Sequence, residues 1–278
     1  MDTDSRDRVT IIKPTTGWAA LNLRDMWLYR ELIFFMTWRD LKVRYKQTLL
    51  GVGWAILQPF MTMVVFSIFF GNLARVPSDG VPYPIFSFTA LIPWTLFSKA
   101  LQDASRSLVA NSHMITKVYF PRMILPVSSV LAGVVDFLIA FVVLLGMMLY
   151  FKITPTANAW TLPLFLLLAV ITAIAVGLWL SALNVLYRDI NYILPFLTQF
   201  WMYLTPIAYP SSMVPEQWRT IYALNPMTGV VEGFRWALLG TGQPPGLMTI
   251  VSAVVAVILL ISGMFYFKRM ERLFADRV

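Results

Sequence analysis

Residues 123–151 read MILPVSSVLAGVVDFLIAFVVLLGMMLYF, and this stretch contains a single charged residue, Asp136. About 20 consecutive apolar residues in a helix are enough to cross the hydrocarbon core of a bilayer. The apolar residues follow one another without the strict alternation of a half-buried strand, so they predict a helix. A helix also satisfies its own backbone N–H and C=O groups, for which lipid offers no partners. The stretch therefore predicts an integral membrane protein.

Five further segments have the length and apolar character of membrane spans. With the first stretch they give six predicted transmembrane helices, at 48–71, 83–103, 123–151, 160–187, 191–209 and 246–267. A membrane β-barrel would need segments of about 10 residues with alternating hydrophobicity. The long runs of Leu, Val, Ile and Phe do not alternate in this way. The predicted fold class is an all-α integral membrane protein with six transmembrane helices.

The composition agrees with a membrane protein and excludes several kinds of site. Hydrophobic residues are 58% of the 278 residues and charged residues 13%, against roughly 45–50% and about 25% in soluble domains. The mean hydropathy is +0.69. The chain has no cysteine and one histidine, His113, which excludes disulfides, thiol catalysis and a metal centre built from several histidines. We expect no metal site.

The positions of Lys and Arg predict the orientation. Seventeen of the 22 lie before the first span, after the last span, or in the loops on that side, and four lie in the opposite loops. The positive-inside rule then places both termini in the cytoplasm, and the first 25 residues lack the apolar core of a signal peptide. The expected regions are a cytoplasmic N-terminus 1–47, a membrane domain 48–267 and a cytoplasmic tail 268–278. The net charge of +8 then reflects topology and anionic lipid headgroups, and we expect no nucleic-acid partner.

The segment Arg24–Lys46, just before the first span, is rich in Trp and Arg. Leu28, Leu32, Phe35 and Met36 recur at helical spacing, which predicts an amphipathic helix in the headgroup plane. Such a helix could be a plain membrane anchor. It could instead dock a cytoplasmic partner or an anionic substrate head, because clustered Arg and Lys bind phosphates well.

Two connections are more structured than ordinary loops. The cytoplasmic connection Ala104–Pro121 is too polar to span, yet it contains a short helical pattern, which fits either a helix that receives a push from a motor subunit or a connector on the bilayer surface. On the outer side, residues 206–245 contain six prolines around two short helical stretches, Glu216–Leu224 and Pro226–Leu239. We expect a re-entrant or interfacial helical hairpin there. Its acidic and basic residues, Glu216 with Arg219 and Glu232 with Arg235, are spaced to pair on a helix face.

Charged and small residues inside the predicted spans are further candidates. Asp136 is the only carboxylate well inside a span, and we favour a hydrogen-bonded structural or pore-facing role over proton coupling because its sequence neighbours are apolar. Lys99 and Asp103 are expected to pair at the cytoplasmic end of the second span. A stripe of small residues, Ala169, Ala173, Gly177 and Ser181, permits close helix approach, within the subunit or at a dimer seam.

The chain contains no phosphate-binding loop of the form G-x-x-x-x-G-K-[ST] and no Gly-Lys dipeptide. It also lacks G-x-S-x-G, H-E-x-x-H and paired catalytic carboxylates. We therefore expect no catalytic residue in this chain, and an ATP-driven transport reaction would need its ATPase on another chain.

Several segments resemble the membrane subunits of ABC exporters of cell-surface polysaccharides. They are WRDLKVRYKQTLLG at 38–51 with Trp54 and Pro59, ITKVYFPR at 115–122 with Leu125-Pro126, YRDI at 187–190 with Pro195, and Asn225-Pro226-Met227 through Glu232 to Arg235. The likeness covers roughly residues 30–268. O-antigen, capsule and teichoic acid are alternative cargoes within these families.

The resemblance implies a bacterial inner-membrane transporter in which two copies of this chain enclose a channel above two separate ATP-binding subunits that hold ATP and Mg²⁺. It implies that 105–117 is the coupling helix, with Arg106, Leu108, His113, Ile115 and Lys117 as the residues nearest the ATPase. The implied substrate is a polysaccharide on an undecaprenyl-diphosphate carrier, with Arg39, Lys42, Arg44 and Lys46 as candidates to meet the diphosphate. Aromatic residues of the first and fifth spans are candidates to line the sugar path: Trp54, Phe60, Phe66, Phe196, Phe200 and Tyr203.

Three other functions are considered. An ABC exporter of a small molecule, such as a drug or haem, would have the same architecture and a discrete pocket. An ion-coupled secondary transporter would show internal repeats and a set of coupling carboxylates, and the chain has neither pattern. A membrane glycosyltransferase would need cytoplasmic catalytic aspartates, and Asp103 and Asp189 make no convincing pair.

Overall fold

The computed structural model describes residues 23–46, 53–242 and 244–277, and these residues form helices and connections without a β-strand. In chain order the helices are α1 (Leu23–Leu28), α2 (Arg30–Lys46), α3 (Gly53–Phe66), the π-helix η2 (Ser67–Leu73), α4 (Tyr83–Ala110), α5 (Ser112–Lys117), α6 (Ile124–Tyr150), the 3₁₀ turn η3 (Ala157–Thr161), α7 (Leu162–Leu186), α8 (Ile190–Leu204), the 3₁₀ turn η4 (Ser211–Met213), α9 (Glu216–Ala223), α10 (Pro226–Leu239) and α11 (Leu247–Arg277). The predicted all-α class is confirmed for this part of the chain.

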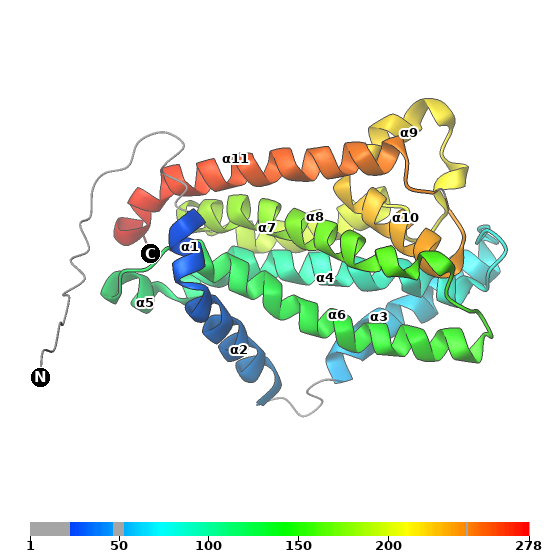
Figure 1. The fold of residues 1–278 in the computed structure, drawn as a ribbon, viewed down its shortest axis with the longest axis horizontal. Coiled ribbons are helices and arrows are strands. Elements are labelled where there is room, and N and C mark those ends of the chain that lie inside the picture. The colour runs from blue at the N-terminus through cyan, green and yellow to red at the C-terminus, as the bar shows by residue number, and fades with distance from the viewer. Residues whose placement is uncertain (1–22, 47–52, 243, 278) are drawn as a thin grey trace, which may run out of the picture.

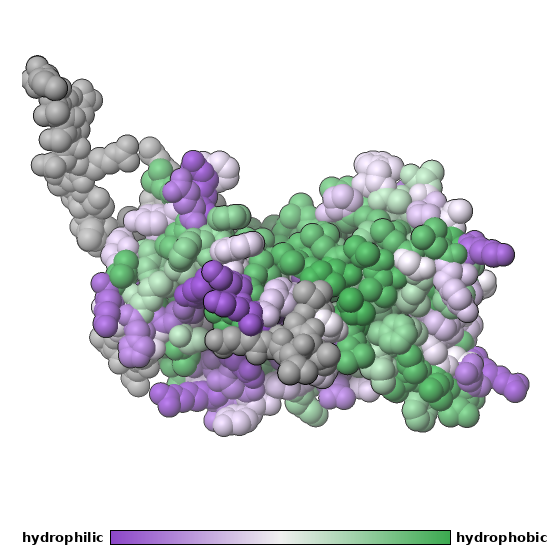
Figure 2. Space-filling view, turned by 90° about the horizontal axis from the view of Figure 1, so that it is seen from below, coloured by the Kyte–Doolittle hydropathy of each residue, from purple (hydrophilic) through white to green (hydrophobic). Residues whose placement is uncertain are grey.

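The long helices lie side by side in one elongated bundle (Figure 1). α1, α2 and α5 gather at one end, together with the last turns of α11, and α9 and α10 lie at the other. Figure 2 shows apolar residues across the middle of one face and more of the hydrophilic residues at the end with α1, α2 and α5. This distribution is typical of a bundle whose middle is covered by lipid.

Four helices of the described residues are long and apolar enough to cross a membrane: Gly53–Leu73, Ile124–Tyr150, Ala157–Leu186 and Leu247–Phe274. They correspond to the first, third, fourth and sixth predicted spans, and the predicted residues 48–52 lie outside the described part. α4 and α8 cover the second and fifth predicted spans but are not among the four. α4 is less apolar because it contains charged, hydroxyl and proline residues. α8 has 15 residues, which span about 22 Å at 1.5 Å per residue.

Three boundaries differ from the sequence prediction. The amphipathic helix is interrupted at Tyr29 between α1 and α2. α4 continues past residue 103 to Ala110, so the predicted coupling helix 105–117 is two pieces, the end of α4 and the short α5. α11 runs through the predicted tail, where Lys268 pairs with Glu271 at 2.5 Å. Phe274 packs against Phe267 in this extension, so local contacts keep the helix intact beyond the apolar run.

The amphipathic character predicted for the N-terminal helix is not confirmed. α2 packs on α6, and Met36 is buried in a core cluster with Leu32 and Ile33 packed against it. Leu28 and Phe35, which were expected on the same face, are 63% and 59% exposed. Apolar side chains therefore cover more than one face of this segment, with only one of them turned to the protein.

α4 occupies the centre of the bundle and contacts α3, α6, α7, α8 and α10. The small-residue stripe of α7 lies against it, since a Cβ on Gly177 would come 3.0 Å from the Cβ of Ala104. Ala169, Ala173 and Ser181 of the stripe are fully buried. The small-residue stripe thus packs helices within the chain, which was one of the two expected uses beside a dimer seam.

Residues 206–245 contain two helices, α9 and α10, close to the predicted limits. The Asn225 side chain caps α10 by accepting from the backbone N–H of Met227 at 3.1 Å, and Gly240 ends the helix with φ +68°. Both predicted pairs form, Glu216–Arg219 at 3.7 Å and Glu232–Arg235 at 3.3 Å.

Candidate functional site: a polar groove between α3 and α8

A groove of about 490 Å³ lies between α3 and α8, with α4 as its floor. Its lining consists of Gln58, Met61, Thr62, Val65, Phe66, Trp94, Ser98, Gln102, Thr198, Gln199, Met202 and Tyr203. On α4 the lining residues recur every four positions, and on α3 every three or four, so each helix turns one face to the groove. The groove is a long, open feature of the bundle.

The groove lining is polar but uncharged. Half of the lining residues carry an amide or an aliphatic hydroxyl: Gln58, Thr62, Ser98, Gln102, Thr198 and Gln199. Such groups both donate and accept hydrogen bonds. The rings of Phe66, Trp94 and Tyr203 lie among them. This mixture can contact a hydroxyl-rich molecule by its polar edges and its C–H faces without a fixed charge.

The aromatic residues predicted for a sugar path divide into three groups. Phe66 and Tyr203 line the groove. Trp54 lines a neighbouring cavity behind α3. Phe60, Phe196 and Phe200 lie on the open surfaces of α3 and α8 and are 38%, 70% and 55% exposed. The sequence analysis missed Trp94 and the amides Gln58 and Gln102. A four-residue spacing of Trp94, Ser98 and Gln102 was the only signal for them.

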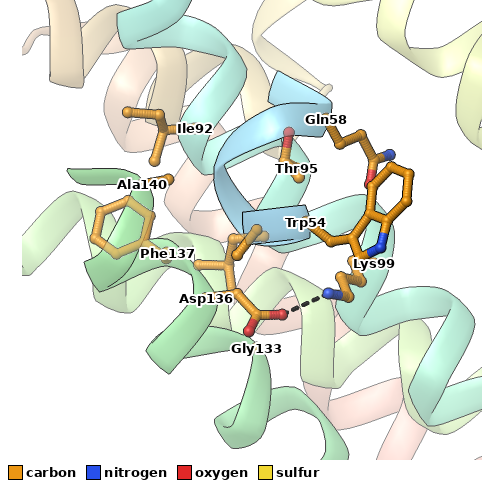
Figure 3. Close-up of a pocket in the computed structure, with 11 residues that line it drawn as sticks. Trp54, Gln58, Ile92, Thr95, Lys99, Gly133, Asp136, Phe137 and Ala140 are labelled. Atoms are coloured by element: carbon orange, nitrogen blue, oxygen red, sulfur yellow. Dashed lines mark hydrogen bonds and ion pairs between the residues drawn. The ribbon is translucent and has the colours of Figure 1, made fainter. Parts of the chain in front are cut away.

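The cavity behind α3 has a volume of about 20 Å³, room for about one water molecule, and an ion pair with a half-exposed Lys99 and a buried Asp136 lines it (Figure 3). Lys99 of α4 donates to Oδ2 of Asp136 of α6 at 2.6 Å. Trp54 and Gln58 of α3 lie over this pair. Gln58 lines both this cavity and the groove, so the ion pair and the groove share one wall.

Two residues from the end of α2 complete an ionic cluster around Asp136. Arg44 donates through Nη1 to Asp136 and through Nη2 to Asp103, both at 2.6 Å. The Tyr45 hydroxyl also donates to Asp136. Two cations therefore face two carboxylates, and this balance offsets the desolvation of the Asp136 side chain, which is 9% exposed.

The cluster corrects one prediction and confirms another. Lys99 pairs with Asp136 and not with Asp103, whose partner is Arg44. Asp136 is hydrogen-bonded as expected, and its partners come from α2 and α4 and not from its own apolar helix. Sequence neighbours on one helix therefore gave no information on this environment.

A second pocket, of about 430 Å³, opens at the α2–α4 junction near the end of the bundle with α5. It brings together Arg39 and Arg44 of the four predicted diphosphate residues and adds Arg106. Arg39 also pairs with Asp40 at 2.8 Å. Lys42 and Lys46 are exposed and are not part of this lining.

The residues predicted to face an ATPase have mixed surroundings. Arg106, His113 and Lys117 are exposed at the end of the bundle. Leu108 and Ile115 are 0% and 5% exposed and belong to a core cluster. Their side chains hold α4 and α5 in place and offer no surface for a partner.

Comparison with known proteins explains the architecture. The profile of the family described as ABC-2 type transporter matches residues 31–239, about three quarters of the chain. The chain belongs to this family. The matched residues run from α2 through α10 and include the groove, the ionic cluster and the α2–α4 pocket, while α11 follows the matched part.

Related ABC-2 type transporters are named as polysaccharide exporters. The chain is 27% identical to the O-antigen export system permease protein RfbA of Myxococcus xanthus, over 92% of this chain and 98% of that protein. It is 28% identical to RfbA of Klebsiella pneumoniae, over 88% and 94%. It is 24% identical to the polysialic acid transport protein KpsM of Escherichia coli, over 84% and 91%. The chain is thus a multi-pass ABC-2 permease homologous to permeases for O-antigen and other polysaccharides.

Proposed function

We propose that this ABC-2 permease is the membrane subunit of an ATP-driven exporter that moves an undecaprenyl-diphosphate-linked polysaccharide, of the O-antigen kind, across the bacterial inner membrane. The observation that carries the proposal is the groove lined by uncharged amides, hydroxyls and aromatic rings. The names of the relatives support the same cargo class.

The groove chemistry suits a polymer better than a compact ligand. A chain of variable length cannot be enclosed in one pocket, and strong binding at any point would stop its movement. Side-chain amides exchange hydrogen bonds with sugar hydroxyls at a small net free energy, about 0.5–1.5 kcal/mol each. Rings such as Trp94 and Tyr203 present flat apolar faces. A weakly binding, continuous path of this kind favours sliding.

The groove is open on one side, and we propose that a second copy of the chain closes it. The two wall helices α3 and α8 carry large exposed apolar residues, among them Phe60, Phe196 and Phe200. Two grooves facing each other would enclose a channel with α3 and α8 of both copies as its walls. Where these rings face water, their burial between the two copies would contribute roughly 25 cal/mol of association free energy per Å². Where they face lipid, van der Waals packing between the helices would favour association instead.

The proposed topology has six crossings, with both termini in the cytoplasm. α4 can cross although it is less apolar, because most of its surface is buried against other helices. α8 completes its crossing with the following residues, and α9 and α10 return as a re-entrant hairpin at the outer end. The excess of hydrophilic residues at the α1, α2 and α5 end supports this orientation.

The driving reaction is assigned to a separate ATP-binding subunit, which would hold ATP and Mg²⁺. Each copy of the permease would rest on one such subunit through the end of α4 and α5, where Arg106, His113 and Lys117 are exposed. The α2–α4 pocket is the proposed contact for the carrier diphosphate. Arg39, Arg44 and Arg106 meet there, and guanidinium groups bind phosphate through paired hydrogen bonds. Lys42 and Lys46 would add positive charge nearby.

The test is deletion of the gene in a producing bacterium, with complementation by wild-type or variant chains. We expect long lipid-linked glycan to accumulate inside the cells. The double variant Gln58→Leu and Gln102→Leu should restore less surface glycan than wild type at equal membrane abundance. Thr249→Ala, away from the groove, serves as the control. Normal surface glycan in the deletion strain would refute the proposed function, and export of a small lipophilic molecule alone would favour the small-molecule exporter.

A further inference from the structure

The three charged residues of α4 lie along one stripe of that helix. Lys99, Asp103 and Arg106 are four and three positions apart, so they stand above one another on the helix surface. All other residues of 83–110 are uncharged. We call these three residues the charged stripe of α4. It runs beside the groove floor and leads into the exposed end of the helix.

Each member of the charged stripe reaches a different helix. Lys99 binds Asp136 of α6 at 2.6 Å. Asp103 accepts from Arg44 at the end of α2, also at 2.6 Å. Arg106 donates from Nε to Oδ1 of Asn191, the second residue of α8, at 3.2 Å. The stripe thus joins the groove floor α4 to one groove wall, α8, and to α2 and α6 outside the groove.

The ionic side of the junction supports the α3 wall. The first turns of α3 lie over the Lys99–Asp136 pair through Trp54 and Gln58 (Figure 3). Arg44 joins this pair to Asp103, because its two terminal nitrogens bind both carboxylates. A change at Asp103 therefore alters the ion cluster on which α3 rests.

The other side of the junction supports the α8 wall. Asn191 donates from Nδ2 to Oδ1 of Asn184 of α7 at 2.9 Å. Asn184 in turn donates to the backbone carbonyl of Ser105 on α4 at 2.9 Å, and this amide is fully buried. The start of α8 is therefore bonded to one turn of α4 by two routes, through Arg106 and through Asn184.

We propose that the charged stripe couples both walls of the groove to the cytoplasmic end of α4, with Asp103, Arg106 and Asn191 as positioning residues. The attachments fall within about 10 Å of helix, at 1.5 Å per residue. A shift or rotation of this stiff, buried helix would move α3 and α8 together. The coupling to ATP hydrolysis rests on the proposed function, whereas the control of wall spacing is a property of this chain alone.

The experiment measures wall positions by spin labels in the full-length chain in lipid nanodiscs. The chain has no cysteine, so each introduced pair is unique, and labelled chains are diluted with unlabelled ones. Leu57 of α3, Leu197 of α8 and Val142 of α6 are exposed and serve as label sites. One pair joins 57 to 142, and the other joins 197 to 142.

We expect Asp103→Asn to broaden the 57–142 distance distribution and to leave 197–142 unchanged. Asn191→Ala should do the reverse. Asp103→Glu should restore the wild-type width. Two matched controls remove equivalent contacts elsewhere: Lys268→Gln breaks an ion pair at 2.5 Å on α11, and Ser262→Ala removes the hydrogen bond from Trp179 at 3.3 Å. Both should leave each distribution unchanged.

In complexes with the ATP-binding subunit, the same two variants should export several-fold less polysaccharide per ATP hydrolysed while ATP hydrolysis continues. Unchanged distance distributions in both variants would overturn the proposal. Equal broadening of both label pairs in every variant and control would also overturn it, because that result would indicate a merely structural effect. If the wild-type complex moves no lipid-linked polysaccharide, the proposed function fails, and the label distances still decide the proposal for the stripe.

Discussion

Replacing Arg235 with leucine would remove a cation from the interior of the outer hairpin. Arg235 is 1% exposed and donates to the carbonyls of Pro206 at 2.6 Å and Ile207 at 2.7 Å. It pairs with Glu232 at 3.3 Å, and its guanidinium lies 3.6 Å from the ring centroid of Phe86. The residue thus joins α10 to α4 and to the loop after α8.

The expected loss of stability follows from what the variant leaves behind. The Glu232 side chain is 9% exposed, and removing one partner of a buried ion pair costs about 3–5 kcal/mol because the other charge remains uncompensated. In domains of comparable length, each kcal/mol shifts the midpoint of thermal unfolding by about 2–4 °C. We therefore expect a decrease of roughly 6–20 °C.

The assay is thermal unfolding of the purified chain in detergent, followed by loss of the monodisperse peak in size-exclusion chromatography. Arg219→Leu is the matched control, because its partner Glu216 is 91% exposed and sits 3.7 Å away. Such exposed pairs contribute about 0–1 kcal/mol. Adding Glu232→Leu to Arg235→Leu should recover part of the loss. Equal shifts for Arg235→Leu and Arg219→Leu would refute the reasoning.

Two further predictions concern the core. Gly177→Leu should sharply reduce the yield of folded chain, because its Cβ would lie 3.0 Å from the Cβ of Ala104 and the larger side chain would separate α7 from α4. Gly146→Ala is the control, because no atom lies within 4 Å of the added Cβ. Equal yields of the two variants in a fluorescence size-exclusion assay would count against the packing argument. Asp136→Asn should destabilise the chain by about 3–5 kcal/mol because two cations lose their shared carboxylate. Export per folded molecule should change little. A variant with full stability and no export would instead indicate proton coupling.

Helix positions could be predicted closely from the sequence because they depend on local patterns. The limits of α6 fall within one residue of the predicted 123–151, and α10 has the predicted limits Pro226–Leu239. The length of the apolar run sets the limits of α6. A capping Asn, a first-turn Pro and a terminal Gly set the limits of α10. Prediction failed at the ends of α4 and α11, where polar helical turns continue. On α11 the local contact Phe267–Phe274 and a hydrogen bond from Arg122 to the carbonyl of Glu271 at 2.6 Å hold this extension.

The candidate site could be predicted only in part. Of the residues predicted for a sugar path, Phe66 and Tyr203 line the groove, and of those predicted for a diphosphate, Arg39 and Arg44 share a pocket. The amides Gln58 and Gln102 and the hydrogen bond between Arg106 and Asn191 were missed. Each of these depends on which helices are neighbours, and helical periodicity contains no information on the identity of the neighbour.

Taken alone, the order of residues determined the membrane class and most helix ranges, since hydrophobic length acts on each segment separately; the orientation stays a prediction from Lys and Arg. Only the tertiary structure decided that Asp136 meets Arg44 and Lys99, and that α3, α4 and α8 share an uncharged polar groove. Arg44 and Asp136 are 92 positions apart in the chain. Their contact arises because the buried carboxylate needs compensating charge, and packing of α2 and α4 on α6 supplies it.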